Sequence, residues 1–302
     1  MQRVRPYVLS ANYRLGNYKD VHWIIGSGRS GSTWVSDMIG YRRKLRNVLE
    51  PYRPHVIEQS NLMPLHAYVR SGTLPEDLRT YYASVFSGEF QHPDMDSAAN
   101  SLFYRGLLVK DVFASLFAKS VSDAFPQVKV SLLIRNPHDV AISMMSKSSW
   151  TWIDDPAVFL ENEELVEDYL EPFKDLIQDI SEGRSQYLKY ITVWCISNYV
   201  PLMQFGLDGL NVLYYDCIKR DPVGEVWDYW ERWGNSRRRM VIPTWKSKKL
   251  SAVSIGRKSI VNEPGRSEVE RGRRILEDFG FGQLYTMDGR PNRDALSKTF
   301  VP

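Results

Sequence analysis

Short apolar runs alternate with longer stretches along the chain, and these runs predict the strands of a sheet. Four of them contain few polar residues, which is typical of strands covered on both faces. The segments between the runs are long enough to hold helical crossovers, so the strands are predicted to be parallel. The pattern predicts an α/β protein with a three-layer α/β/α arrangement around a central parallel sheet. The predicted strands lie at about 21–26, 106–110, 128–134 and 210–215.

The first apolar run leads into a loop rich in glycine and serine, and the loop opens a helix. The loop reads GSGRSGST from Gly26 to Thr33, where the helix is predicted to begin. Its glycines allow sharp turns and close approach of the backbone to a ligand. The N-terminus of the helix adds unpaired N–H groups and a positive dipole end. This loop is therefore predicted to bind a phosphate or sulfate group.

The same loop comes close to the phosphate-binding motif of nucleoside triphosphatases, G-x-x-x-x-G-K-[ST]. Ser32 stands where that motif has its lysine, the residue that contacts the β- and γ-phosphates. The basic residue of this loop is instead Arg29. The sequence therefore argues against triphosphate hydrolysis, and a kinase-like phosphotransferase is left as the weaker alternative. A non-catalytic protein that binds nucleotides or nucleic acid is another alternative.

A second strand end carries a second candidate anion site. The strand over 128–134 is followed by Arg135 and then by a strong helix start. Asn136 suits the N-cap and Pro137 the first helical position. Ser143 lies about two turns further along the same helix, so its hydroxyl needs a partner elsewhere. An arginine at a strand end with a serine eight residues later suits a bound phosphate monoester.

These two elements resemble the donor-binding motifs of sulfotransferases that use 3′-phosphoadenosine-5′-phosphosulfate (PAPS). GSGRSGSTW is similar to their 5′-phosphosulfate loop, and IRNPHDVAIS is similar to their 3′-phosphate motif. VLEPYRPHV also resembles the Glu-Pro segment of carbohydrate sulfotransferases, and VLYYDCIKRDP resembles the late Tyr-Glu-Asp-Leu strand end. The resemblance covers about residues 20–235. It implies a P-loop NTPase-like sulfotransferase fold and an enzyme that transfers a sulfuryl group from PAPS without a metal.

The resemblance also implies roles for individual residues of the donor site. Trp34 is expected to pack near the adenine or the loop, and Arg135 and Ser143 are expected to hold the 3′-phosphate. SIGRKSIVNEPG is similar to the late Arg-Lys-Gly loop of cytosolic members, which implies that Arg257 and Lys258 close over the same phosphate. The residues expected to hold the 5′-phosphosulfate are Arg29, Ser30, Gly31, Ser32 and Thr33.

The candidate catalytic residues are those that could take the proton of the acceptor hydroxyl or contact the sulfuryl group. Glu50 follows the short apolar pair Val48-Leu49 and precedes a proline, which predicts a carboxylate at a strand end beside the loop. It is the preferred base, and His55 is its rival. Lys110 is predicted to touch the bridging oxygen or the sulfuryl group, or else to pair with a local acid. Arg29 is expected to stabilise the charge that builds on the leaving group.

Length and composition indicate how many domains the chain forms. The 302 residues are 43% apolar and 25% charged, which suits one sulfotransferase domain over 1–302 with a sizeable core. Acceptor-side insertions are expected at about 50–105 and 150–185, and a basic segment at about 237–274. Neither an apolar run of about 18 residues nor a secretion signal is apparent. The expectation is a cytoplasmic protein, either microbial or an excised catalytic domain. The cysteines and histidines have no metal-ligand spacing.

Charge is unevenly distributed, although the net charge is only +3. Segment 154–182 holds eleven acidic residues and a single lysine, whereas segment 237–274 holds twelve basic residues. An acidic run is usually a solvated helix face, and its alternative interpretation is a lid that attracts a cationic acceptor or repels polyanions. The acceptor is predicted to be a sugar or a small natural product, neutral or cationic. The basic segment lacks interleaved aromatic residues, so no nucleic-acid partner is expected.

Overall fold

The computed structural model describes residues 4–41, 43–99, 101–146, 153–234, 263–286 and 289–300. Its centre is a five-stranded sheet with the order β2-β3-β1-β4-β5. Every neighbouring pair of strands in this sheet is parallel, as the sequence predicted. The strands are β1 (Asp20–Gly26), β2 (Leu45–Leu49), β3 (Gly106–Asp111), β4 (Lys129–Ile134) and β5 (Asn211–Tyr214).

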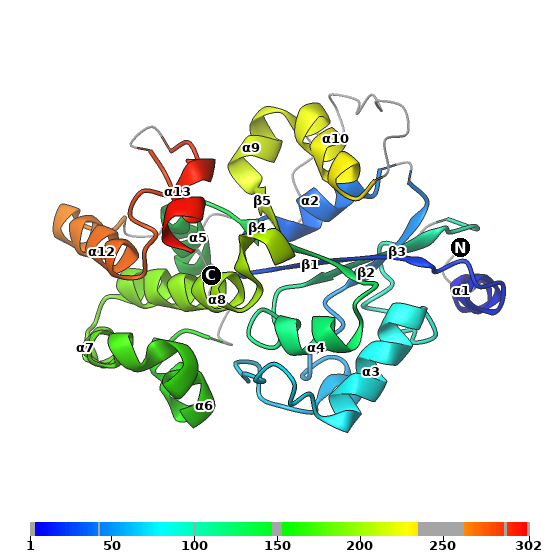
Figure 1. Ribbon diagram of the computed structural model, residues 1–302, viewed down its shortest axis with the longest axis horizontal. Helices are drawn as coiled ribbons and strands as arrows, with labels where there is room; N and C mark the ends of the chain where they lie inside the picture. The colour runs from blue at the N-terminus through cyan, green and yellow to red at the C-terminus, as the bar shows by residue number, and fades with distance from the viewer. Residues whose placement is uncertain are drawn as a thin grey trace.

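Helices cover both faces of the sheet, so the predicted three-layer arrangement is confirmed (Figure 1). One face packs on a cluster that joins Ile24, Leu108, Leu133 and Leu213 of the strands to the covering helices. The helices of that layer are α2 (Ser32–Ile39), α9 (Tyr215–Arg220) and α10 (Pro222–Arg232). The opposite face carries α3 (Glu76–Ser87), α4 (Ala118–Ala124), α5 (Pro137–Met145) and the long α8 (Gln186–Gly209).

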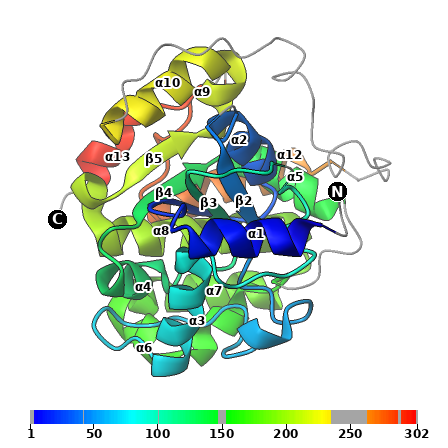
Figure 2. The ribbon, with the colours of Figure 1, turned by 90° about the vertical axis from the view of Figure 1, so that its right-hand side faces the viewer.

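The remaining elements lie around these layers, and Figure 2 shows α1 in front of the sheet. The segments expected as insertions hold short helices and loops as well as α3. The division into one domain with insertions stays a prediction. The remaining elements in chain order are α1 (Arg5–Arg14), η1 (Glu58–Ser60), η2 (Pro156–Glu161), α6 (Glu163–Leu165), η3 (Val166–Leu170), η4 (Glu171–Phe173), α7 (Lys174–Glu182), α12 (Arg266–Asp278) and α13 (Arg293–Thr299).

Local sequence signals account for the elements that carry the candidate site. The Asn136 side chain caps α5 by accepting hydrogen bonds from the backbone N–H groups of His138 and Asp139, at 3.0 and 3.4 Å. Pro137 is the first residue of that helix, as predicted. Helix α2 begins at Ser32, one residue before the predicted start. Among the described residues, none of the helices is long and apolar enough to cross a membrane.

Candidate active site

The loop between β1 and α2 brings its backbone very close to neighbouring elements. Gly26 has a φ of +150°, and a Cβ atom there would lie 2.6 Å from the carbonyl oxygen of Leu133 on β4. Gly31 has a φ of +79°, and a Cβ atom would lie 2.4 Å from the ring of Tyr215. Both positions thus require glycine, for conformation and for space. The loop is fixed against the ends of β4 and β5 and leads directly into the N-terminus of α2.

The hydroxyl groups of the loop differ in their surroundings. Ser30 is fully buried, and its Oγ lies 2.8 Å from the Oγ of Ser27. Ser32 is buried as well, whereas Thr33 is half-buried. The Ser30 side chain therefore stabilises the loop from within. The donor-binding roles predicted for Ser30, Gly31, Ser32 and Thr33 stay predictions.

Arg29, Ser143 and Arg135 lie together, although they are far apart in the sequence. Arg29 Nε donates a hydrogen bond of 3.0 Å to Ser143 Oγ on α5. Arg135 Nη1 donates one of 3.0 Å to the backbone oxygen of Arg29. The structure thus joins the two predicted anion sites into one continuous region at the carboxyl ends of β1 and β4, where open α/β sheets bind ligands.

The electrostatics of this region suit an anion. Burial lowers the pKa of Arg29, and the nearby Arg135 guanidinium lowers it further, because two cations lie close together. Arg135 has Asp139 at 3.6 Å as a counter-charge. Its Nε is buried and has no hydrogen-bond partner among the described residues. An orphaned guanidinium N–H beside a second arginine fits a bound phosphate group.

Tyr215 packs against this region. It was not identified from the sequence as a site residue. Its ring lies 4.6 Å from the Arg135 guanidinium carbon and close beneath Gly31. Trp34 packs edge-on against the same ring, with the centroids 5.5 Å apart. Trp34 is therefore buried beneath the loop, and its expected closeness to the adenine stays a prediction. The only sequence signal for Tyr215 was its place in the motif VLYYDCIKRDP.

Asp216, the next residue, ties the start of α5 to the C-terminal part of the chain. Its Oδ2 accepts hydrogen bonds from the Asn136 backbone N–H at 3.2 Å and from the Tyr285 hydroxyl at 3.1 Å. The contact joins the start of α9, directly after β5, to the start of α5 beside Arg135. Sequence reasoning noted the motif that contains Asp216 without assigning this residue a role. The predicted site residues Arg257 and Lys258 lie outside the described residues.

The second group of predicted residues lies at the carboxyl ends of β2 and β3. Lys110 Nζ donates a hydrogen bond of 2.6 Å to Glu50 Oε1. Lys110 is only 3% exposed and Glu50 16%, so the pair is largely shielded from water. Lys110 is also paired in register with Ile24 of β1, the strand that leads into the loop. The structure thus shows the local acid partner that the sequence analysis considered for Lys110.

His55 lies in an exposed turn near this pair. Its ring meets Phe113 edge-on, with the centroids 6.4 Å apart. Partial burial lowers the pKa of His55 and the charge of Arg53 lowers it further, while the carboxylate of Glu50 opposes this shift. A neutral imidazole could accept a proton, so His55 stays the alternative base.

Asp111, the residue after Lys110, is a buried carboxylate that sequence reasoning missed. It has no exposed surface, and it accepts hydrogen bonds from the backbone N–H groups of Tyr52 and Phe113, at 3.0 and 3.1 Å. The Tyr82 hydroxyl adds a third at 3.1 Å. Burial raises the pKa of Asp111 to about 7, and the charge of Glu50 contributes to that rise. Asp111 stands beside apolar residues such as Val112 and Phe113, and it is part of no motif that would have indicated a buried carboxylate.

The acidic segment 154–182 pairs with cations from other parts of the chain. Arg70 donates hydrogen bonds to Glu167 and Asp168 at 2.6–2.8 Å, and Tyr68 donates one of 2.6 Å to Asp168. Lys189 lies 2.7 Å from Asp155, and Arg271 of the basic segment pairs with Asp179. Much of the acidic charge thus has an internal structural partner. Within the described ranges, His, Cys, Asp and Glu side chains form no group of three or more that could hold a metal.

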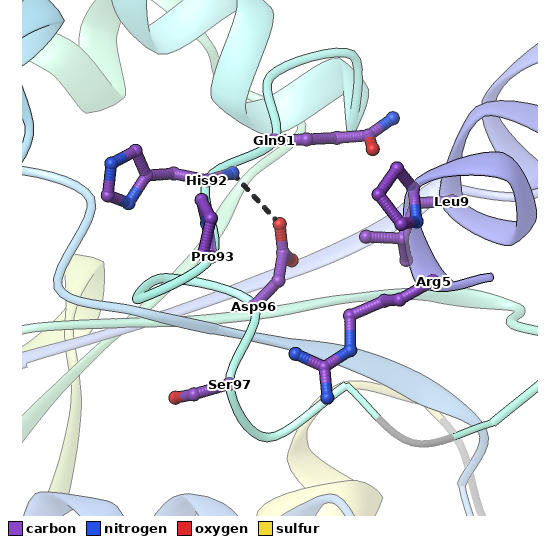
Figure 3. Close-up of a pocket in the computed structure, with 8 residues that line it drawn as sticks. Arg5, Leu9, Gln91, His92, Pro93, Asp96 and Ser97 are labelled. Atoms are coloured by element: carbon purple, nitrogen blue, oxygen red, sulfur yellow. Dashed lines mark hydrogen bonds between the residues drawn. The ribbon is translucent and has the colours of Figure 1, made fainter. Parts of the chain in front are cut away.

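One cavity of about 530 Å³ lies apart from these residues. It is lined by the start of α1 and by segment 91–97, and Figure 3 shows Arg5 and Asp96 on its walls. In Figure 1, α1 and α5 lie at opposite ends of the sheet, so the cavity is remote from Arg135. Asp96 is already engaged by the buried Arg46, at 2.8 and 3.0 Å.

Comparison with known proteins agrees with this arrangement. Residues 19–241 match the family model described as the sulfotransferase domain, so the chain belongs to the sulfotransferase family. The family prediction and the sulfotransferase fold prediction are thereby confirmed. None of the curated proteins matches the chain.

Two solved structures illustrate the distant likenesses of this chain. A sulfotransferase from Alicyclobacillus acidocaldarius is 16% identical, with 86% of this chain and 92% of that chain covered and a TM-score of 0.43. Sulfotransferase STF9 from Mycobacterium avium is 11% identical, with 95% and 83% covered and a TM-score of 0.44. The assignment to the family rests on the domain match.

Proposed function

We propose that this sulfotransferase takes its sulfuryl group from PAPS and transfers it to an acceptor hydroxyl. The observation that carries the proposal is the junction of Arg29, Ser143 and Arg135 between the loop and α5. A donor with a 5′-phosphosulfate and a 3′-phosphate needs two neighbouring anion sites. The strands that lead into them, β1 and β4, are neighbours in the sheet.

On the donor side, the protein supplies positioning and charge stabilisation. Arg29, the loop N–H groups and the N-terminus of α2 bind the 5′-phosphosulfate. Arg135 and Ser143 bind the 3′-phosphate, with the orphaned Arg135 Nε as a donor. PAPS provides the activated sulfuryl group, and Arg29 stabilises the negative charge that the leaving phosphate gains. The chemistry needs in-line alignment more than covalent help from the protein.

On the acceptor side, Glu50 is the proposed base and Lys110 its partner. Lys110 holds Glu50 Oε1 at 2.6 Å, while Oε2 has Arg53 Nη1 at 3.9 Å. Oε2 is therefore the oxygen that takes the proton as the acceptor oxygen bonds to sulfur and the bond from sulfur to the leaving phosphate oxygen breaks. Lys110 also contacts the sulfuryl group. His55 is the alternative base, because its lowered pKa favours the neutral imidazole.

We further propose a neutral or cationic acceptor, a sugar or a small natural product. Support comes from segment 154–182, where exposed carboxylates outnumber the cations that pair with them. Like charge repels a polyanion over a Debye length of about 8–10 Å at moderate ionic strength. The internal pairs of Arg70, Lys189 and Arg271 show that part of this charge stabilises the fold instead.

Donor binding and a screen of acceptors test the proposal. Calorimetry without magnesium should show binding of adenosine 3′,5′-bisphosphate, the product of PAPS. Sugars, phenols, amines and lipids are then incubated with PAPS and the protein, and products are read by the mass gain of one sulfuryl group. Magnesium-dependent binding of ATP, with no binding of the bisphosphate, would favour the kinase-like alternative instead.

A further inference from the structure

Asp111 is a buried carboxylate that has no cation among its hydrogen-bonding partners in the described part of the chain. It is fully buried, and its three donors are the backbone N–H groups of Tyr52 and Phe113 and the hydroxyl of Tyr82. Burial of a carboxylate is costly unless strong hydrogen bonds compensate it. Neither anion site includes this residue. Its place at the end of β3 therefore needs another explanation.

Asp111 and Lys110 hold the same loop from two sides. Successive side chains of a strand point to opposite faces of the sheet. Lys110 donates a hydrogen bond to the Glu50 carboxylate. Asp111 Oδ2 accepts one from the backbone N–H of Tyr52, which follows Glu50 by two residues in the chain. The stretch from Glu50 to Tyr52, named the Glu50 loop, is thereby attached to consecutive residues of β3.

The Glu50 loop has a backbone conformation that needs such support. Glu50 has a φ of +48°, a left-handed conformation that is unfavourable for a residue with a side chain. Its N–H donates a hydrogen bond of 2.6 Å to the Lys110 carbonyl oxygen, and the Tyr81 hydroxyl donates one of 2.6 Å to the Pro51 carbonyl oxygen. Asp111 supplies the attachment at the far end of the loop, at Tyr52.

We propose that Asp111 is a positioning residue that holds the Glu50 loop so that the Glu50 carboxylate faces Lys110 and the acceptor. The inference rests on the proposed role of Glu50 as the base. Both oxygens of Asp111 accept a hydrogen bond from a backbone N–H: Oδ1 from Phe113 and Oδ2 from Tyr52. Oδ2 also accepts the Tyr82 hydroxyl, so an asparagine can keep its single oxygen at Tyr52, whereas an alanine removes the acceptor altogether.

The test compares Asp111→Ala with Tyr82→Phe in the full chain. Both variants remove hydrogen bonds from the same buried cluster, but only Asp111→Ala removes the acceptor of the Tyr52 N–H. Hydrogen exchange read by mass spectrometry should show at least tenfold faster exchange of the Tyr52 amide in Asp111→Ala. In Tyr82→Phe, the Tyr52 amide should exchange at the same rate as in the unaltered protein. Melting temperatures show whether the two variants lose similar stability.

Kinetics then connect the position of the loop with the chemistry. PAPS turnover is measured as formation of adenosine 3′,5′-bisphosphate, with an acceptor from the screen or with water. A small displacement of a reacting group can cost about a hundredfold in rate. Asp111→Ala should lower kcat by about ten- to a hundredfold and leave the Kd of the bisphosphate within twofold. Tyr82→Phe should keep kcat within threefold.

Two results would overturn the inference. One is normal protection of the Tyr52 amide in Asp111→Ala, which overturns the inference even if no turnover is detected. The other is a parallel loss of kcat and bisphosphate affinity in both variants, which would assign Asp111 to general stability. Failure of the unaltered protein to bind the bisphosphate would instead count against the proposed function, because the exchange measurement does not depend on it.

Discussion

Lys110 and Glu50 meet across the ends of two neighbouring strands, with Lys110 Nζ 2.6 Å from Glu50 Oε1. They come together because Leu49 and Lys110 are partners in the parallel register of β2 and β3. Glu50 follows directly after that pair. The contact fixes which carboxylate oxygen faces the lysine and leaves Oε2 with Arg53 at 3.9 Å.

If Glu50 is the base, Glu50→Gln should lower turnover by about 10²–10⁴-fold, the usual contribution of a positioned base. The amide keeps the shape of the side chain but cannot take the proton. The affinity for adenosine 3′,5′-bisphosphate should stay unchanged in calorimetry. The control is His55→Ala. Near-normal turnover in Glu50→Gln together with an inactive His55→Ala would transfer the role to His55.

Arg135→Ala should weaken the binding of adenosine 3′,5′-bisphosphate much more than that of adenosine 5′-phosphosulfate, which has no 3′-phosphate. Each charge-assisted hydrogen bond is worth about 1.5–3 kcal/mol. Ser143→Ala should affect both ligands, because Ser143 Oγ also holds Arg29 Nε at 3.0 Å. Calorimetry with both nucleotides measures the difference. Equal losses in Arg135→Ala would contradict the assignment of the 3′-phosphate.

The acidic segment gives a prediction about the acceptor. Replacing Glu163, Glu164, Glu167 and Asp168 by their amides should raise the KM of a cationic acceptor and leave donor affinity unchanged. The effect should shrink at high salt, since screening weakens exposed charges. The matched control neutralises Glu171, Asp175 and Glu182 of the same segment. An unchanged KM in the first variant would indicate that the segment is only a solvent-exposed helix face. Efficient sulfation of a polyanion by the unaltered protein would contradict the prediction of a neutral or cationic acceptor.

The raised pKa of Asp111 predicts that the stability of the protein depends on pH. Its pKa is raised to about 7 in the folded protein, chiefly by burial, from about 3.9 in an unfolded chain. The folded state thus favours the protonated form, and the stability this contributes is complete below about pH 4 and lost as the pH rises through about 7. Each unit of pKa difference corresponds to about 1.4 kcal/mol. Urea unfolding of the protein and of Asp111→Asn across this range should show the difference in free energy of unfolding falling with pH. A constant difference would contradict the raised pKa.

Asp96 and Arg46 form a buried pair on which the fold depends. Arg46 is fully buried, and besides Asp96 it donates hydrogen bonds to the carbonyl oxygens of Gly88 and Phe90. Asp96→Ala leaves the guanidinium without its counter-charge, so the free energy of unfolding should fall by about 3–5 kcal/mol. The exposed Asp94→Ala serves as control. A loss below about 1 kcal/mol in Asp96→Ala would show that Arg46 finds other compensation.

Local sequence signals were sufficient for much of the fold. Apolar runs located the strands because a strand covered on both faces needs apolar side chains throughout. Asn136 and Pro137 located the start of α5 because capping depends on residues within one helical turn. The glycine-rich loop after β1 was found for the same reason: strand, glycines and helix start are contiguous in the chain.

Residues whose roles depend on packing were missed or left open. Tyr215 supports the loop only because β5 ends beneath Gly31. Asp111 lies among apolar residues in the sequence, and its donors come from the Glu50 loop, from α3 and from Phe113. Neither relationship leaves a periodic pattern that a sequence could reveal.

By itself, the sequence determined the positions of the main strands along the chain, the glycine-rich loop after β1 and the capped helix after β4, because these depend on neighbours along the chain. Only the tertiary structure decided that Arg29 meets Ser143, 114 residues away, and that Lys110 meets Glu50, 60 residues away. The physical reason is the parallel sheet: strand order and register choose which strand ends are adjacent, and therefore which distant side chains share a site.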